Sequence, residues 1–183
     1  AALTLRILPS LIVSKSAADS CDGFCMVNMP EGLMTRGTLK KEIVISLGGF
    51  VAEKMIFGEE NTSSGVYSDI EEATNLANKA IKYYAMGSDP IAIAVAGPGS
   101  NEYFFMSEKH REEAMQLIYD CREEAEQILE KNKLLLLKIS EYLTENHRMD
   151  ELMLGDFVRE YAADSWVREE GFKKKDHYFS FVS

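Results

Sequence analysis

The sequence predicts a mainly α-helical, single domain of residues 1–183 with a small β-sheet or hairpin near its N-terminus. Long stretches repeat apolar residues at intervals of three and four positions, which is the spacing of one face of a helix. Short apolar runs bounded by turn residues occur near the start of the chain, at 11–13 and 24–27. With 183 residues, 46% of them hydrophobic, the chain can bury a sizeable core.

Composition and charge narrow the classes of function. The net charge of −10 argues against a nucleic-acid-binding surface, which would be basic. The three cysteines are too few for a disulfide framework and indicate a reducing compartment. No apolar run approaches the roughly 20 residues of a membrane span. No Walker-type phosphate-binding loop is present, so we expect no ATP site in this chain.

The N-terminal elements are short. Residues 1–8 predict the end of a helix, which Pro9 stops. The apolar runs Leu11–Val13 and Phe24–Val27 predict two strands, separated by a stretch containing Ser, Ala, Asp and Gly. From the residues alone, we expect these strands to form a hairpin that packs over the helices.

Residues 35–57 predict one long helix. Thr35 is a suitable N-cap, and apolar residues at helical spacing give one buried stripe. The pair Gly48-Gly49 interrupts this pattern, at about 1 kcal/mol per glycine relative to alanine. We therefore expect another backbone to pass close to the pair.

The next helix is predicted to begin at a capping box. Gly58 ends the preceding helix, residues 59–67 form a polar loop, and Ser68 with Glu71 has the Ser-x-x-Glu pattern of a helix start. Asp69 then lies in the first turn, where a carboxylate complements the helix dipole. This structural role is one interpretation of Asp69.

The C-terminal half is predicted to be mostly helical. A weak strand at 91–96 precedes two amphipathic helices, at 107–131 and 134–143, and residues 152–163 predict a further short helix. The end of the chain combines a lysine run with aromatic residues. We expect residues 164–183 to form a flexible tail.

Residues 47–74 carry a motif that points to a family. Leu-Gly-Gly at 47–49 is followed by Ala52-Glu53 and Phe57-Gly58-Glu59, and then by Ser63, Gly65, Asp69, Ile70, Ala73 and Thr74. In order and spacing, this stretch resembles the third-ligand segment of the FtsH family of ATP-dependent zinc metalloproteases. The resemblance covers most of the chain and implies that Asp69 is a zinc ligand.

The resemblance implies that two histidines of a His-Glu-x-x-His helix supply the other ligands and that the glutamate of this motif is the general base. The sequence contains no such motif, and its histidines are His110, His147 and His177. In the family, the motif lies just upstream of a segment that resembles residues 1–9. We therefore expect either that it precedes Ala1 in a longer polypeptide or that this protein has lost its histidine ligands. No catalytic residue is assigned within this chain.

The resemblance also implies two supporting roles. Glu53 would accept a hydrogen bond from a ligand histidine, whereas the alternative interpretation is a solvated helix charge beside Lys54. The second strand would form an edge that takes an extended substrate by strand addition, as an alternative to the packed hairpin. The residues of this strand are Phe24, Cys25, Met26 and Val27.

The leading hypothesis is the zinc metalloendopeptidase domain of an FtsH-like ATP-dependent protease, which hydrolyses peptide bonds of unfolded or membrane proteins when complete. The resemblance implies zinc, polypeptide substrates, a homo-oligomer (a hexamer in the family) and an AAA+ ATPase module upstream or in trans. It also implies a location on the cytoplasmic side, with membrane association through an upstream segment. The alternative is a catalytically inactive, protease-like structural or adaptor module that has lost the histidine ligands.

Overall fold

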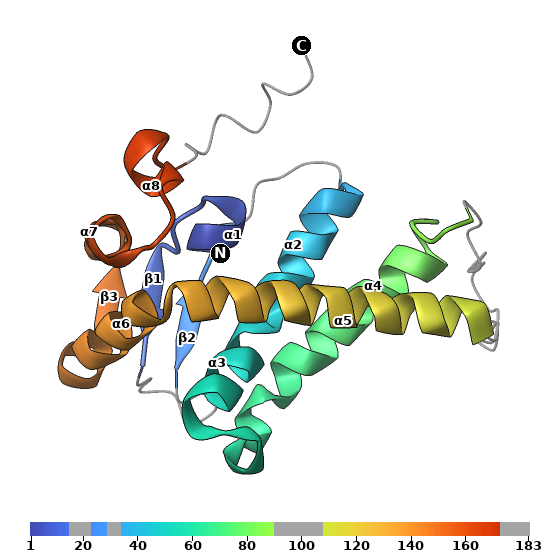
Figure 1. The fold of residues 1–183 in the computed structure, drawn as a ribbon, viewed down its shortest axis with the longest axis horizontal. Helices are drawn as coiled ribbons and strands as arrows, with labels where there is room; N and C mark the ends of the chain where they lie inside the picture. Colours follow the sequence, from blue (N-terminus) through green and yellow to red (C-terminus); the bar gives the residue numbers. More distant parts are fainter. Residues whose placement is uncertain (15–22, 29–33, 90–107, 173–183) are drawn as a thin grey trace. The chain divides into compact units, whose positions relative to one another are not determined.

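Helices account for most of the computed structural model, which describes residues 1–14, 23–28, 34–89 and 108–172 (Figure 1). A mainly α fold with a small sheet is therefore confirmed. The chain divides into two compact units, one of Ala1–Leu33 with Ile128–Ser183 and one of Met34–Gln127. The weak strand expected at 91–96 lies outside the described residues, as do Cys21 and His177.

The first unit contains a three-stranded antiparallel sheet in the order β2-β1-β3. The hairpin strands β1 (Leu11–Val13) and β2 (Phe24–Met26) confirm the prediction, but β3 (Arg148–Asp150) was not predicted. Its sequence gives little signal, because Met149 is the single apolar residue between two charged ones. Met149 is nevertheless only 1% exposed, since pairing with β1 turns it into the core.

The helices of the first unit pack around this sheet. They are α1 (Ala2–Leu5), α6 (Lys133–Asn146), α7 (Glu151–Tyr161) and α8 (Trp166–Glu169). Their core consists of Leu135, Met149, Leu154, Val158 and Val167. The helix α8 and the buried Val167 fall within the segment for which we expected a flexible tail.

The second unit is built from α2 (Arg36–Ser46), α3 (Gly48–Phe57), α4 (Tyr67–Lys82) and most of α5 (Glu108–Lys131). Thr35 caps α2, because its hydroxyl accepts a hydrogen bond from Thr38 N at 3.0 Å. The prediction of one helix from 35 to 57 is wrong, since the helix is interrupted at Leu47, between the end of α2 and the start of α3. Two successive glycines follow the break, and glycine is a poor helix former.

The polar loop before α4 folds into two short 3₁₀ turns, η1 (Glu59–Asn61) and η2 (Ser64–Val66). The expected capping box is wrong, because α4 begins at Tyr67 and its N-cap, Val66, has no side-chain cap. Ser63 instead accepts a hydrogen bond from Gly65 N at 3.1 Å, which caps η2. Ser68 therefore lies inside the helix, one residue after its start.

Small side chains set the packing in the second unit. One face of α4 buries Ala73, Ala77 and Ala80 almost completely, beside the core residues Leu39 and Ile43 of α2. Alanine at these positions lets two helix backbones approach closely. On α5, burial raises the pKa of Cys121 to about 11, so this thiol stays protonated at neutral pH.

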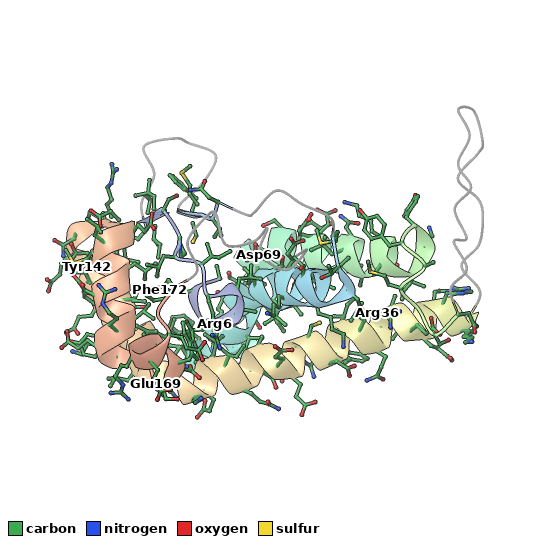
Figure 2. The ribbon with its side chains drawn as sticks, turned by 90° about the horizontal axis from the view of Figure 1, so that it is seen from above. Arg6, Arg36, Asp69, Tyr142, Glu169 and Phe172 are labelled. Carbon is green, nitrogen blue, oxygen red and sulfur yellow. The ribbon has the colours of Figure 1, made fainter. Side chains whose placement is uncertain are left out.

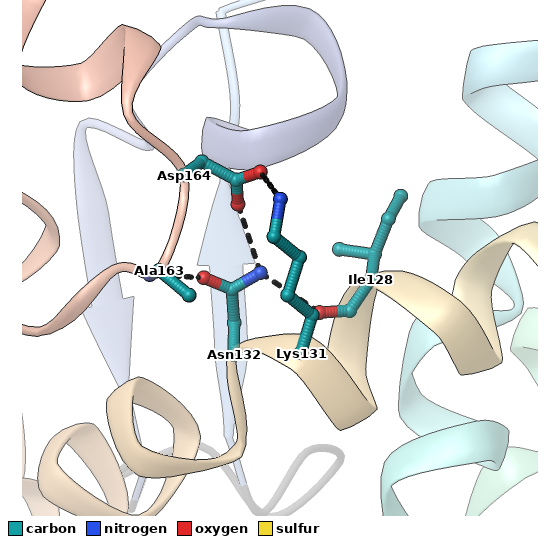
Figure 3. Close-up of polar contacts among 5 residues, drawn as sticks. All are labelled: Ile128, Lys131, Asn132, Ala163 and Asp164. Carbon is teal, nitrogen blue, oxygen red and sulfur yellow. Dashed lines mark hydrogen bonds and ion pairs between the residues drawn. The ribbon is translucent and has the colours of Figure 1, made fainter.

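A cluster of polar contacts in the first unit, which we call the polar knot, joins the end of α5 to the segment after α7 (Figure 3). It consists of Ile128, Lys131, Asn132, Ala163 and Asp164. The Asn132 side chain is 2% exposed and donates to Ile128 O and Asp164 Oδ2, both at 2.9 Å. Its Oδ1 accepts from Ala163 N at 2.9 Å. Lys131 completes the knot by an ion pair to Asp164 at 2.5 Å. The amide nitrogen of Asn132 thus donates two hydrogen bonds and its oxygen accepts one, so both polar atoms of this buried side chain have partners.

Replacing Asn132 by alanine should destabilise the protein by about 2–4 kcal/mol, because it leaves buried polar partners unpaired. Asn146→Ala is the matched control, since Asn146 is exposed and, among the described residues, its side chain donates to Tyr142 O, four residues earlier. Urea denaturation of both variants measures the difference. Equal losses of stability in the two variants would contradict the role of the knot.

The knot also predicts a contribution to acid stability. Desolvation alone would raise the pKa of Asp164, but hydrogen bonds from Lys131 and Asn132 outweigh it and hold the pKa below its ordinary value. A carboxyl whose pKa is lower in the folded state stabilises the fold above its unfolded pKa and loses this contribution as pH falls through the folded pKa. The free energy of unfolding of Asp164→Asn should therefore decline less steeply than that of the wild type below about pH 4. Denaturation curves from pH 7 to 2.5 measure this.

Candidate functional site

Asp69 lies where α4 begins, against the start of α3 in the same unit (Figure 2 labels Asp69). It continues the row of Ala73, Ala77 and Ala80, because residues four apart share a face of a helix. Ala73, Ala77 and Ala80 are buried, whereas Asp69, at the end of this row, is exposed to solvent and directs one carboxylate oxygen at Gly49 of α3. Asp69 therefore lies beside α3 while part of its surface stays open to solvent.

The Asp69 carboxylate comes close to α3 at Gly49. A Cβ built on Gly49 would lie 2.8 Å from Asp69 Oδ2, nearer than real Cβ atoms come to an oxygen. Gly48, in contrast, has open space within 4 Å. Among the described residues no other backbone comes within 4 Å of a Cβ built at either glycine, and the expected neighbour, which the resemblance gives as the histidine-bearing helix, stays a prediction. The neighbour that the structure shows is a side-chain carboxylate, and it approaches only the second glycine.

The environment of Asp69 is unusual for a helix-terminal carboxylate. Desolvation raises its pKa, so the ionised form is held at some cost. Within the described residues, no hydrogen bond or ion pair engages its oxygens. A bound cation would offset this cost by restoring an electrostatic partner.

Glu53 lies four residues after Gly49, on the same face of α3. Its Oε2 is shielded from solvent and has no hydrogen-bond partner in the described part of the chain. The adjacent Lys54 pairs with Glu59 at 3.2 Å instead. A shielded carboxylate oxygen without a donor is rare in native structures and calls for a partner.

These carboxylates do not make a zinc site by themselves. A hydrolytic zinc site takes three protein ligands. The described ranges contain no group of three or more His, Cys, Asp or Glu side chains that could hold a metal ion. His147 ends α6 with a left-handed backbone, and His110 lies in the first turn of α5. Asp69 fits one corner of such a site, and no step of peptide hydrolysis follows from the present residues alone.

The strand candidates lie at an edge of the sheet in the first unit. Phe24, Cys25 and Met26 form β2, and Val27 follows directly after it. Among the described strands β2 pairs only with β1, so it is an edge strand whose other side meets no described strand. This is the geometry that strand addition requires.

Comparison with known proteins identifies the family. The model of Peptidase family M41 matches residues 22–155, so the chain belongs to this family. Zinc metalloproteases called FtsH are among its relatives. The one from Neorickettsia risticii is 31% identical over 68% of this chain and 20% of its own length. The one from Trieres chinensis is 30% identical over 71% and 21%.

A further relative is subunit YME1 of the mitochondrial inner membrane i-AAA protease supercomplex of Saccharomyces cerevisiae, with 28% identity over 69% of this chain and 17% of its own length. The chain thus spans about a fifth of the length of the curated relatives it matches. Zinc is the metal that the names of the FtsH relatives specify. Among the described helices, none is long and apolar enough to cross a membrane.

The two glycines offer a direct test of this geometry. Gly48→Ala should raise the free energy of unfolding by up to about 1 kcal/mol, because alanine favours a helix and the site is open. Gly49→Ala should lack this gain, because its Cβ meets the Asp69 carboxylate. Chemical denaturation of both variants, with the Asp69 carboxyl carbon followed by NMR, measures the contrast. Equal stabilisation with an unmoved Asp69 signal would contradict the contact.

Proposed function

We propose that this chain forms the peptidase domain of an FtsH-like ATP-dependent zinc metalloprotease that hydrolyses peptide bonds of unfolded or membrane proteins. The observation that carries this proposal is the position of Asp69. Its carboxylate lies beside Gly49 of α3, open to solvent on one side and without a hydrogen-bond or ion-pair partner among the described residues. A metal ligand needs accessible oxygens that no other group engages.

Asp69 then contributes one ligand to a zinc site, and Glu53 accepts a hydrogen bond from a histidine ligand. The buried, partnerless Oε2 of Glu53 supports this role, because such a bond fixes the orientation of the histidine. The histidines and the general base belong to a His-Glu-x-x-His segment that is not in this sequence. No hydrolytic step is therefore assigned to residues of this chain.

The remaining parts of the proposal concern substrate and assembly. An extended polypeptide would add beside β2, on the side that pairs with no described strand. From the family resemblance we propose a homo-oligomer, a hexamer by family analogy, that works with an AAA+ ATPase module upstream or in trans. We propose on the same ground a location on the cytoplasmic side, in a reducing compartment. The name of the yeast relative, a subunit of an i-AAA protease supercomplex, supports assembly into a larger complex.

Zinc content of the protein expressed from its complete gene tests the site. The wild type should carry stoichiometric zinc by native mass spectrometry, and Asp69→Asn should lose it while keeping its fold. Glu71→Gln is the matched control, because Glu71 is an exposed carboxylate in the same helix and should be dispensable. Stoichiometric zinc in Asp69→Asn would refute the ligand role. A wild type without zinc would favour the inactive structural module.

Glu53→Gln probes the supporting role separately. It keeps the shape of the side chain but removes the charge that strengthens a hydrogen bond to a histidine. We expect zinc affinity to fall about 10- to 100-fold, as is typical when such a supporting group is changed. Competition with a fluorescent zinc chelator measures the affinity. An unchanged affinity would mean that Glu53 has no part in the site.

A further inference from the structure

The three-stranded sheet has one face toward the core and one face away from it. Residues paired across antiparallel strands point to the same side, and the register pairs Ile12 with both Cys25 and Met149. Met149 belongs to the core cluster of the first unit and Ile12 packs against that cluster, so this row defines the inner face. The other rows pair Leu11 with Met26 and Val13 with Phe24, and these define the outer face.

The outer face is apolar next to the open edge of the sheet. Phe24 is 41% exposed and Met26 is 50% exposed, and both lie on the edge strand β2. Leu11 and Val13 continue this apolar strip behind them. Proteins usually protect such edges with charged residues, but β2 has none. Charges occur on the opposite edge, where Arg148 and Asp150 pair with Val13 and Leu11.

The inner row has a different character. Cys25 is the edge residue of this row, and desolvation by surrounding protein atoms raises the pKa of its thiol. At neutral pH it therefore presents a small, uncharged side chain. A segment added beside β2 would meet large apolar side chains on the outer face and the small, exposed Cys25, which lies near the amino group of Ala1, on the inner face.

We infer that Phe24 and Met26 determine specificity at this edge and that the edge selects extended segments with large apolar side chains at every second position. Such side chains fall beside Phe24 and Met26, because successive residues of a strand point to opposite faces. Backbone hydrogen bonds supply affinity that is independent of sequence, and the alternate side chains supply selectivity. This inference rests on the proposed addition of a substrate strand at β2.

Fluorescence anisotropy with synthetic peptides tests it on the protein expressed from its complete gene, with a metal chelator present to prevent cleavage. One peptide alternates Phe or Leu with Ser, and a second has the same composition with its apolar residues grouped together. The alternating peptide should bind about 2- to 30-fold more tightly, from two cross-strand side-chain pairs. The Phe24→Ser/Met26→Ser variant should lose this preference.

Met115→Ser/Tyr119→Ser is the matched control, because these exposed side chains lie on α5, far from β2 in sequence, and are 52% and 49% exposed. This variant should keep the preference. An N-methylated alternating peptide tests strand addition at β2 separately from the selectivity given by Phe24 and Met26, because methylation removes backbone hydrogen-bond donors. If methylation leaves binding unchanged, or if no peptide binds, strand addition at β2 is wrong. If methylation abolishes binding but both peptide patterns bind equally, only the role of Phe24 and Met26 is wrong.

Discussion

The packing of the first unit depends on the hydrogen bonds of the Asn132 side chain, which link the end of α5 to residues 163 and 164. Helices α5 and α6 are separated by this residue alone, and its side chain bonds both the end of α5 and the segment that follows α7. That segment leads directly into α8, whose Val167 is part of the core. Segments that are distant in sequence thus share one buried polar group, and their packing depends on its being fully paired.

The candidate site in the second unit depends on a different constraint, the lack of a side chain at Gly49. Asp69 can approach α3 only because nothing projects from that position. The approach desolvates the carboxylate, and this is unfavourable for the isolated domain. Glu53 shows the same feature one turn further along α3, as a shielded oxygen without a donor. Unfavourable polar arrangements of this kind are typical of functional sites, where a ligand or partner completes them.

Much of the helical framework could be predicted from the sequence, because the period of apolar residues reports directly on the buried faces of α4, α5 and α6. The interruption at Leu47 could not, since it involves no side-chain cap, and neither could the start of α4, because Ser63 caps the 3₁₀ turn before it instead of Ser68 capping the helix. The strand β3 depends on its pairing with β1, which leaves no pattern in three residues. Asp69 was found through its motif, whereas its contact with Gly49 depends on how two helices pack.

The row of alanines on α4 has a consequence for how this family can vary. Asp69 stands at the end of the row formed by Ala73, Ala77 and Ala80, so the spacing between helices sets the depth at which its carboxylate lies. A larger residue at any of these positions would lift α4 and move the carboxylate with it, without touching it. Substitutions at these three alanine positions would therefore change the position of the candidate metal ligand.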